Sequence, residues 1–245
     1  MILATAIIKG GTGKTTTATA LLQAGAFSNK RVLGIDLDPQ CNLSMALGRV
    51  KSNYNAYDLL EGLPVIECIQ TTKQNIDLIQ ATEELATVKT STGSIKRLYN
   101  YLQPIKEYYD LIVIDTPPQI GELTYNALMA SDTVIIPLET DQASLQGLNN
   151  LHRITTELLQ AKTEVFKNIY VLANRYDKRA KLNNLMLDMI INTAERLNFS
   201  FIGTVSQNIS IREAQALQKN LFEYAPKSKA TIEYMEIYKE IEKEI

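Results

Sequence analysis

The segment Lys9-Gly10-Gly11-Thr12-Gly13-Lys14-Thr15-Thr16 brings glycines, lysines and hydroxyl side chains together between an apolar run and a helix-forming run. Glycines allow a backbone turn to approach a polyphosphate closely, with several N–H groups pointing inward. A helix that begins at the turn adds its positive N-terminal end, which favours an anion. Lys14 would supply a point charge for the β- and γ-phosphates, and the Thr15 hydroxyl would ligate Mg²⁺. The segment therefore predicts a site for a nucleoside triphosphate with Mg²⁺.

This segment departs from the usual phosphate-loop pattern, G-x-x-x-x-G-K-[ST], because Ile8 stands at the position of the first glycine. It also carries an additional lysine, Lys9. Charge on a transferring phosphoryl group is commonly stabilised by an added cation, which contributes on the order of 10³–10⁵ in rate. Lys9 is the candidate for this cation. Its spacing leaves open whether it acts in its own subunit or in a neighbouring one.

Two apolar, strand-like segments end in aspartates: the first delivers Asp36 and Asp38, and the second delivers Asp115. Open α/β sheets bind their ligands at the carboxyl ends of the strands, so these carboxylates are expected beside the phosphate loop. Asp36 and Asp38 have the same side-chain phase on a strand, so both are predicted to face the loop. Asp38 is the candidate for orienting the attacking water. Thr15, Asp36 and Asp115 are the candidate metal ligands.

Apolar strand-like runs alternate with amphipathic, helix-like stretches along the whole chain. The predicted strands lie at 2–8, 31–37, 76–79, 111–114, 133–138, 169–175 and 201–205. The predicted helices follow the phosphate loop and lie at 42–47, 57–60, 92–107, 143–164, 182–197 and 229–244. About seven strands in this alternation predict an α/β fold, a mostly parallel twisted sheet with helices on both faces. Because the sequence contains no repeat, low-complexity segment or linker, residues 1–245 are expected to form a single domain.

Composition places the chain among ordinary globular proteins: it has 245 residues, of which 45% are hydrophobic and 21% charged. No apolar run approaches the roughly 20 residues that cross a bilayer. Cys41 and Cys68 lie far apart without metal-ligand spacing, so both are expected to be reduced thiols of a cytoplasmic protein. A net charge of -2 argues against a uniformly basic nucleic-acid-binding protein but leaves a local basic patch open.

Together these motifs resemble those of the ParA/MinD group of ATPases. The segment from Lys9 to Thr16 is similar to the deviant Walker A motif of that group, Asp36-Leu37-Asp38-Pro39-Gln40 to the second motif of its ParA branch, and Asp115-Thr116-Pro117-Pro118 to its Walker B motif. The resemblance covers essentially the whole chain, because it continues at Pro137, Ser144-Leu145-Gln146-Gly147-Leu148 and Phe222-Glu223-Tyr224-Ala225-Pro226.

The resemblance implies a P-loop NTPase fold, ATP and Mg²⁺ as ligands, and weak ATPase activity. It implies an ATP-bound sandwich homodimer in which Lys9 reaches the partner's phosphates. That dimer would bind non-specific double-stranded DNA in the cytoplasm, on the nucleoid, and a ParB-like, centromere-binding activator would stimulate hydrolysis. Residues from Lys9 to Thr16 would bind the nucleotide, Asp38 would orient water, and Asn174 and Asn208 would lie at the base.

Two departures from the family pattern bear on DNA binding. The chain starts at its first predicted strand, whereas many plasmid members carry a helix-turn-helix extension, so operator-specific autorepression is not expected. Where the family often has Pro-Arg-Asn, this chain has Ser206-Gln207-Asn208 and therefore no arginine. The remaining candidates for DNA contacts are Lys178, Arg179, Lys181, Arg212, Lys219, Lys227 and Lys229.

Three other functions of the same fold remain as alternatives. A MinD-type, membrane-associated positioning ATPase needs a basic amphipathic tail, whereas the polar face of the last predicted helix is mainly glutamate. An iron–sulfur reductase would need a cysteine motif, which Cys41 and Cys68 do not form. A bacterial tyrosine kinase would need a tyrosine cluster, and the C-terminal tyrosines are too few. DNA partitioning is therefore the favoured function, with no membrane partner.

Overall fold

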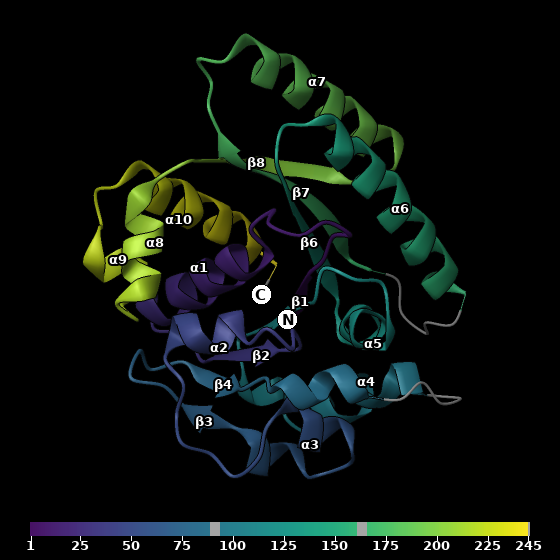
Figure 1. Cartoon of the computed structure of the whole chain (residues 1–245), viewed down its shortest axis with the longest axis vertical. Helices are drawn as coiled ribbons and strands as arrows, with labels where there is room; N and C mark the ends of the chain where they lie inside the picture. Colours follow the sequence, from purple (N-terminus) through teal and green to yellow (C-terminus); the bar gives the residue numbers. More distant parts are fainter. Residues whose placement is uncertain (89–93, 161–165, 245) are drawn as a thin grey trace.

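The computed structural model describes residues 1–88, 94–160 and 166–244. They form an eight-stranded sheet in the order β3-β4-β2-β5-β1-β6-β7-β8 (Figure 1). Every neighbouring pair is parallel except the edge pair β3–β4. The strands are β1 (Ile2–Thr5), β2 (Val32–Asp36), β3 (Gln70–Thr71), β4 (Asp77–Ile79), β5 (Leu111–Asp115), β6 (Thr133–Leu138), β7 (Asn168–Tyr176) and β8 (Ser200–Ser206). The mostly parallel α/β sheet predicted from the sequence is confirmed.

Helices cover both faces of the sheet, with α1 and α8–α10 on one face and α4–α7 on the other (Figure 1). Their bounds are α1 (Lys14–Phe27), α2 (Asn42–Leu47), α3 (Ala56–Leu60), α4 (Arg97–Leu102), α5 (Glu122–Ala130), α6 (Gln142–Leu159), α7 (Lys181–Arg196), α8 (Ile209–Ala216), α9 (Leu221–Tyr224) and α10 (Lys229–Glu242). None of the helices in the described ranges is long and apolar enough to cross a membrane.

Side chains along the central strands point alternately to the two faces of the sheet, which explains why helices are needed on both faces. In β1, Leu3 packs in one apolar cluster with α1 and α10, whereas Ile2 and Ala4 pack in the cluster on the opposite face. All three side chains are buried. A strand whose side chains are apolar in both directions requires cover on both faces, as is typical of parallel sheets. Because β1 runs parallel to its neighbours β5 and β6, the phosphate loop that follows it emerges at the carboxyl ends of these strands.

Several predicted bounds are corrected by the structure. The predicted helix 92–107 is shorter: α4 begins at Arg97 and ends at Leu102, Pro104 follows, and residues 92 and 93 lie outside the described ranges. Proline has no N–H to donate to the preceding turn and its ring clashes with that turn's carbonyl, which explains the early end. The predicted helix 143–164 corresponds to α6 as far as Leu159, and residues 161–165 lie outside the described ranges. The first strand ends at Thr5, so the turn towards the phosphate loop begins earlier than the apolar run suggests.

Candidate nucleotide site

The predicted phosphate loop joins the central strand β1 to helix α1, which begins at Lys14. Gly11 and Gly13 have φ values of 77° and 98°, a left-handed conformation that side chains other than glycine rarely adopt. A Cβ at Gly13 would also lie 2.5 Å from Nδ2 of Asn174. Glycine is therefore required at position 13 by both the backbone and the space around it. The N-terminus of α1 is left open to an anion in front of this turn.

The two lysines of the loop have different partners. Lys14 is buried, and its Nζ donates to the carbonyl oxygen of Lys9 at 3.2 Å. Burial lowers the pKa of Lys14, an effect opposed by the negative charges of Asp115 and Asp38. The side chain of Lys9 instead pairs with the carboxylate of Asp141, the N-cap residue of α6. The loop thus keeps one cation inside and places the other at its rim.

Asp115 lies at the tip of β5, directly beside Thr5 of β1 and Asp36 of β2. Its Oδ2 accepts a hydrogen bond from the Thr15 hydroxyl at 2.6 Å, and its Oδ1 accepts one from the Thr5 hydroxyl at 3.0 Å. Burial and the nearby charge of Asp36 raise the pKa of Asp115 to about 7. The structure therefore brings two predicted metal ligands, Thr15 and Asp115, into direct contact.

Asp36 is fully buried, and its carboxylate is held within the protein. Oδ2 accepts hydrogen bonds from the backbone N–H and the hydroxyl of Ser44, at 2.8 and 2.7 Å, and Oδ1 accepts one from the N–H of Asp38 at 3.1 Å. Burial raises the pKa of Asp36 to about 6, although these hydrogen bonds oppose the shift. Asp36 fastens helix α2 to the sheet, and its assignment as a metal ligand stays a prediction.

Asp38 lines the cavity in front of the phosphate loop, but it reaches that position by a different route from the one predicted. Strand β2 ends at Asp36, so Asp38 lies in the following turn and does not share a strand phase with Asp36. Its Oδ1 accepts a hydrogen bond from the N–H of Gln40 at 3.0 Å, which fixes the turn. A carboxylate held in this way at a phosphate site is suited to orient a water molecule.

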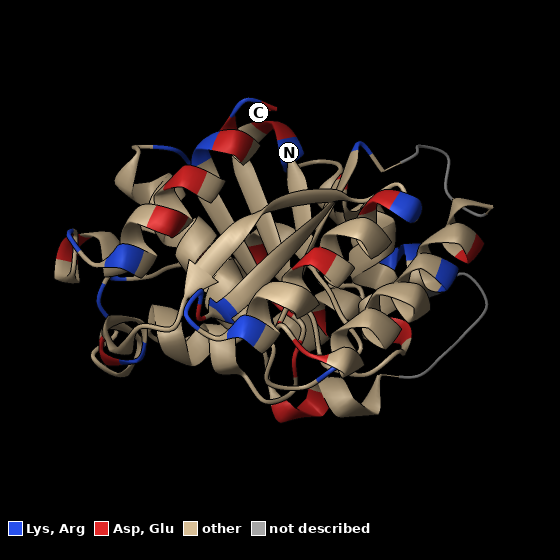
Figure 2. Cartoon of the chain, turned by 90° about the horizontal axis from the view of Figure 1, so that it is seen from above, with Lys and Arg blue, Asp and Glu red and all other residues tan. Residues whose placement is uncertain are grey.

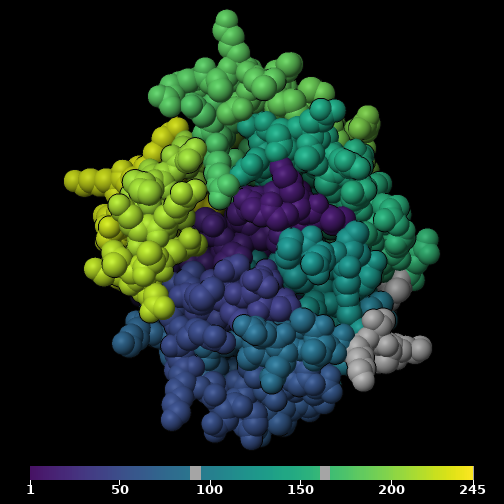
Figure 3. All heavy atoms as spheres, in the orientation of Figure 1, coloured from purple at the N-terminus to yellow at the C-terminus, as the bar shows by residue number. Residues whose placement is uncertain are grey.

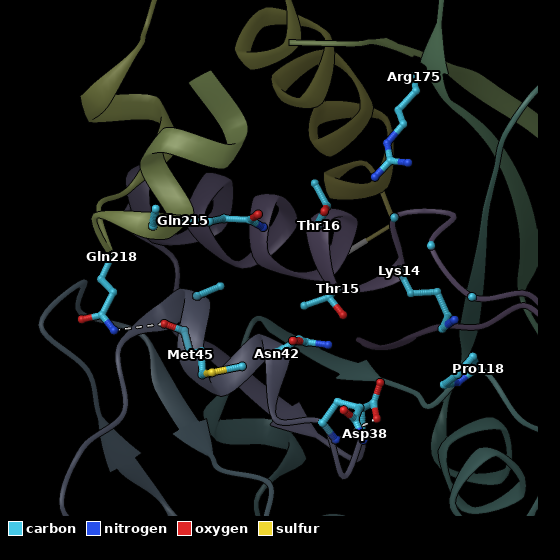
Figure 4. A pocket seen from close by; sticks show the side chains of 16 residues that line it. Lys14, Thr15, Thr16, Asp38, Asn42, Met45, Pro118, Arg175, Gln215 and Gln218 are labelled. Atoms are coloured by element: carbon cyan, nitrogen blue, oxygen red, sulfur yellow. Dashed lines mark hydrogen bonds between the residues drawn. The ribbon is translucent and has the colours of Figure 1, made fainter. Parts of the chain in front are cut away.

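The cavity in front of the loop has a volume of about 630 Å³, which is within the range of small-molecule sites. It is open at the centre of one face, where the phosphate loop lies exposed between segments from both halves of the chain (Figure 3). Lys14, Thr15, Asp38, Asn42, Met45, Pro118, Arg175 and Gln215 surround it, and Figure 4 shows their side chains. The cavity is therefore built from α1, the α2 region, the end of β7 and the end of α8.

The two predicted base-contacting residues line a second, adjacent cavity of about 150 Å³, together with Gly13 and Thr16. Asn174 is buried, and its Nδ2 donates to the carbonyl oxygen of Thr12 and the hydroxyl of Thr17, both at 3.2 Å. Asn208 is the N-cap of α8, where its Oδ1 accepts from the N–H of Ser210 at 2.9 Å. Asn174 thus supports the loop from behind. A contact of either residue with the base stays a prediction.

Sequence reasoning missed several residues that border the main cavity. Arg175 lies in both cavities, has a left-handed backbone with φ of 53°, and pairs with Glu139 at 2.7 Å. Its position directly after Asn174 was a usable signal, because it follows the end of a strand at the ligand-binding edge. Gln215 and Gln218 come from the α8 region, whose helix has no phosphate-binding motif. Nothing in the local sequence marks them.

The residues present fit a magnesium ion that is bound together with nucleotide phosphates. No group of three or more histidine, cysteine or acidic side chains that could hold a metal occurs within 1–88, 94–160 and 166–244. Mg²⁺ commonly uses one or two protein ligands and completes its shell with phosphate oxygens and water. The Thr15–Asp115 pair matches that requirement, and a divalent cation would offset the charge buried at Asp115 and Asp36.

Comparisons with known proteins show the family to which this chain belongs. A family model described as AAA domain matches residues 1–169. The sporulation initiation inhibitor protein Soj of Bacillus subtilis is 36% identical, covering 95% of this chain and 94% of its own length. The chromosome-partitioning ATPase Soj of Thermus thermophilus is 31% identical, covering 95% and 92%.

A solved structure of a related protein has the same fold as this chain. The putative plasmid partition protein of Borrelia burgdorferi, solved with bound AMPPNP, has a TM-score of 0.84 and is 25% identical, covering 100% of this chain and 99% of its own. Its similarity extends over the helices on both faces as well as the sheet. The likeness to Soj across almost the entire length, together with the phosphate loop and the Thr15–Asp115 pair, identifies this chain as a member of the Soj/ParA family of partitioning ATPases.

Proposed function

We propose that this protein is a DNA-partitioning switch driven by ATP. Two copies would close around ATP and Mg²⁺, and the closed dimer would bind non-specific double-stranded DNA. Hydrolysis, stimulated by a centromere-binding activator, would release the dimer from DNA. The observation that carries the proposal is the separation of the two loop lysines. Lys14 lines the cavity, whereas Lys9 does not line it and pairs with Asp141, with 25% of its side chain exposed.

Each residue of the site has a role in this proposal. The loop amides and Lys14 would hold the phosphates, and Thr15 with Asp115 would hold Mg²⁺, which neutralises charge on the β- and γ-phosphates when bound. Asp38 would orient the attacking water. Lys9 would leave Asp141 and stabilise charge on the phosphates of the partner. Because added cations of this kind contribute on the order of 10³–10⁵ in rate, hydrolysis would depend on dimer formation.

The proposed DNA surface lies around the loop between β7 and α7. Lys178 and Arg179 line a hollow of about 290 Å³ together with Lys229 and Gln207. Arg179 also pairs with Asp177 at 3.0 Å, so Lys178 is the better candidate for a phosphate contact. Figure 2 shows basic and acidic residues interspersed along the chain in that view, in keeping with the net charge of -2. A basic patch of this size on each copy would suit DNA binding that requires a dimer, because the dimer combines two such patches.

The test is binding to non-specific double-stranded DNA at low salt, with ATP and Mg²⁺, with ADP, and without nucleotide. We expect binding only with ATP, and a decline with salt whose log–log slope steepens by about 0.9 for each phosphate contact. Lys178→Ala removes one contact from each copy of the dimer, so it should reduce that slope by about 1.8. The matched control is Lys106→Ala, an exposed lysine near Met1 at the opposite end of the strands. Binding that is equal in all nucleotide states, or absent in all, would refute the proposal, and lipid vesicles would then be tested.

A further inference from the structure

Helix α2 begins at Asn42, after the turn that contains Asp38, and forms one wall of the main cavity through Asn42, Met45 and Ala46. It has only six residues. An isolated helix of this length is not stable, because nucleation fixes several residues for few hydrogen bonds. The position of α2 must therefore be set by contacts with other elements. At its N-terminal end, Asp36 supplies these contacts through Ser44.

The C-terminal end of α2 is held by two glutamines from distant parts of the chain. Nε2 of Gln74 lies 3.2 Å from the carbonyl oxygen of Ala46 and 3.1 Å from that of Leu47. Nε2 of Gln218 donates to the carbonyl oxygen of Met45 at 3.2 Å, and Figure 4 shows this bond at the edge of the cavity. The last carbonyls of a helix lack partners within it. These side chains supply the missing donors.

Gln74 also connects α2 to two further elements of the site. It lies in the tight turn between β3 and β4, and its Nε2 is 3.1 Å from the carbonyl oxygen of Gln218, directly after α8. Its Oε1 accepts a hydrogen bond at 2.8 Å from Nε2 of Gln23, a buried residue of the phosphate-loop helix α1. One amide group thus joins α1, α2 and the segment after α8, three elements that surround the same cavity.

The orientation of the Gln74 amide follows from its neighbours. Three carbonyl oxygens surround Nε2, and only the NH₂ end of the amide can donate to them. The reverse orientation would place an oxygen against three oxygens. Glutamate has nearly the same shape as glutamine, so Gln74→Glu would keep the packing but place an oxygen against these carbonyl oxygens. This substitution therefore tests the hydrogen bonds of Gln74 without changing the volume of its side chain.

We propose that Gln74 is a positioning residue for ATP hydrolysis. It fixes the end of α2, and α2 in turn fixes Asp38 through the turn in which the N–H of Cys41 donates to the carbonyl oxygen of Asp38 at 2.8 Å. This inference rests on the proposed role of Asp38 in orienting water. Without Gln74, nucleotide would still bind to the loop through Lys14 and Thr15, but the water-orienting carboxylate would be held less firmly.

The test compares Gln74→Glu and Gln74→Ala with Lys73→Ala, a control that removes an exposed side chain from the same turn. Steady-state hydrolysis is measured together with the Kd of a non-hydrolysable ATP analogue. One net hydrogen bond corresponds to a factor of about five, so we expect both Gln74 variants to lose at least about fivefold in kcat. Their Kd for the analogue should change by less than about twofold, because the loop contacts remain.

Amide hydrogen exchange supplies a readout that does not require turnover. Exchange of the α2 amides should accelerate by at least about fivefold in both Gln74 variants, with no change in the central strands. Unchanged α2 exchange in Gln74→Glu, or exchange that rises equally throughout the chain, would overturn the inference. If the wild-type chain hydrolyses no ATP, the proposed function fails, and the exchange result still decides whether Gln74 positions α2.

Discussion

Replacing Asp115 with asparagine should stabilise the protein without ligands while removing one of the two proposed magnesium ligands. In the folded chain Asp115 is completely buried beside a second carboxylate, Asp36. Its pKa is raised from 3.8 to about 7, chiefly by burial and then by the charge of Asp36. At 1.36 kcal/mol per pKa unit, this shift corresponds to about 4 kcal/mol of cost when Asp115 is ionised in the folded state. Asparagine has no charge to bury.

The magnitude expected for Asp115→Asn follows from this cost. Water entering the phosphate loop solvates part of the charge, so we expect about 2 kcal/mol to appear as added stability. For a chain of this size that corresponds to a rise of roughly 4–8 °C in Tm. The asparagine oxygen can still accept a hydrogen bond from Thr5, and the Thr15 hydroxyl can reverse and accept one from the amide. Neither hydroxyl would be left without a partner.

The stability gained by Asp115→Asn should increase with pH. A carboxyl whose pKa is higher in the folded state than in the unfolded chain gives stability that is full below about 4 and is lost as pH rises to about 7. The advantage of Asp115→Asn should therefore be largest at pH 8 and clearly smaller at pH 5. Thermal unfolding in EDTA without nucleotide measures it, with Asp188→Asn, which removes an exposed charge on α7, as the control. A Tm at pH 8 equal to or below that of the wild type would refute the reasoning.

Four substitutions test the rest of the site. Lys14→Ala should abolish nucleotide binding or turnover, and hydrolysis at the wild-type rate would contradict its role. Asp38→Ala should retain ATP and lower kcat by at least about tenfold, so that a dimer accumulates in gel filtration with ATP. Lys9→Ala should bind ATP as a monomer but lose turnover, and normal hydrolysis would exclude action across two subunits. Gly13→Ala should weaken ATP binding at least about tenfold, because its Cβ would lie 2.5 Å from Asn174, and an unchanged Kd would show that the loop can adapt.

The features that were predictable from the sequence are those with a local cause. The apolar runs that end in Asp36 and Asp115 identified buried parallel strands, and the residues at 42–47 were correctly predicted as a helix. The end of α4 also had a local signal in Pro104, which the amphipathic pattern concealed. Strand β3 escaped prediction because it contains only Gln70 and Thr71 and pairs with β4 alone.

Features that depend on distant contacts could not be found in this way. Asp38 reaches the cavity through a turn rather than along a strand, because the carboxylate of Asp36 captures the N–H of Asp38 and the chain bends there. The role of Gln74 depends on Gln23, Ala46 and Gln218, which lie far from it in sequence. Isolated glutamines carry no periodicity and belong to no motif. Only the folded chain shows that they meet.

The central position of β1 has a consequence for how the protein unfolds. The strand is bonded to β5 on one side and β6 on the other, and the nucleotide loop continues directly from it. Central strands such as β1 belong to the most protected cooperative units of a fold, whereas ligand-binding loops are less protected, so the loop is anchored at one end in the most stable part of the sheet. Free energy of nucleotide binding is then felt by the entire domain, about 2.7 kcal/mol at a ligand concentration one hundred times Kd. Loss of nucleotide should lower resistance to heat and proteolysis throughout the chain, so the lifetime of the protein in a cell would follow its nucleotide supply.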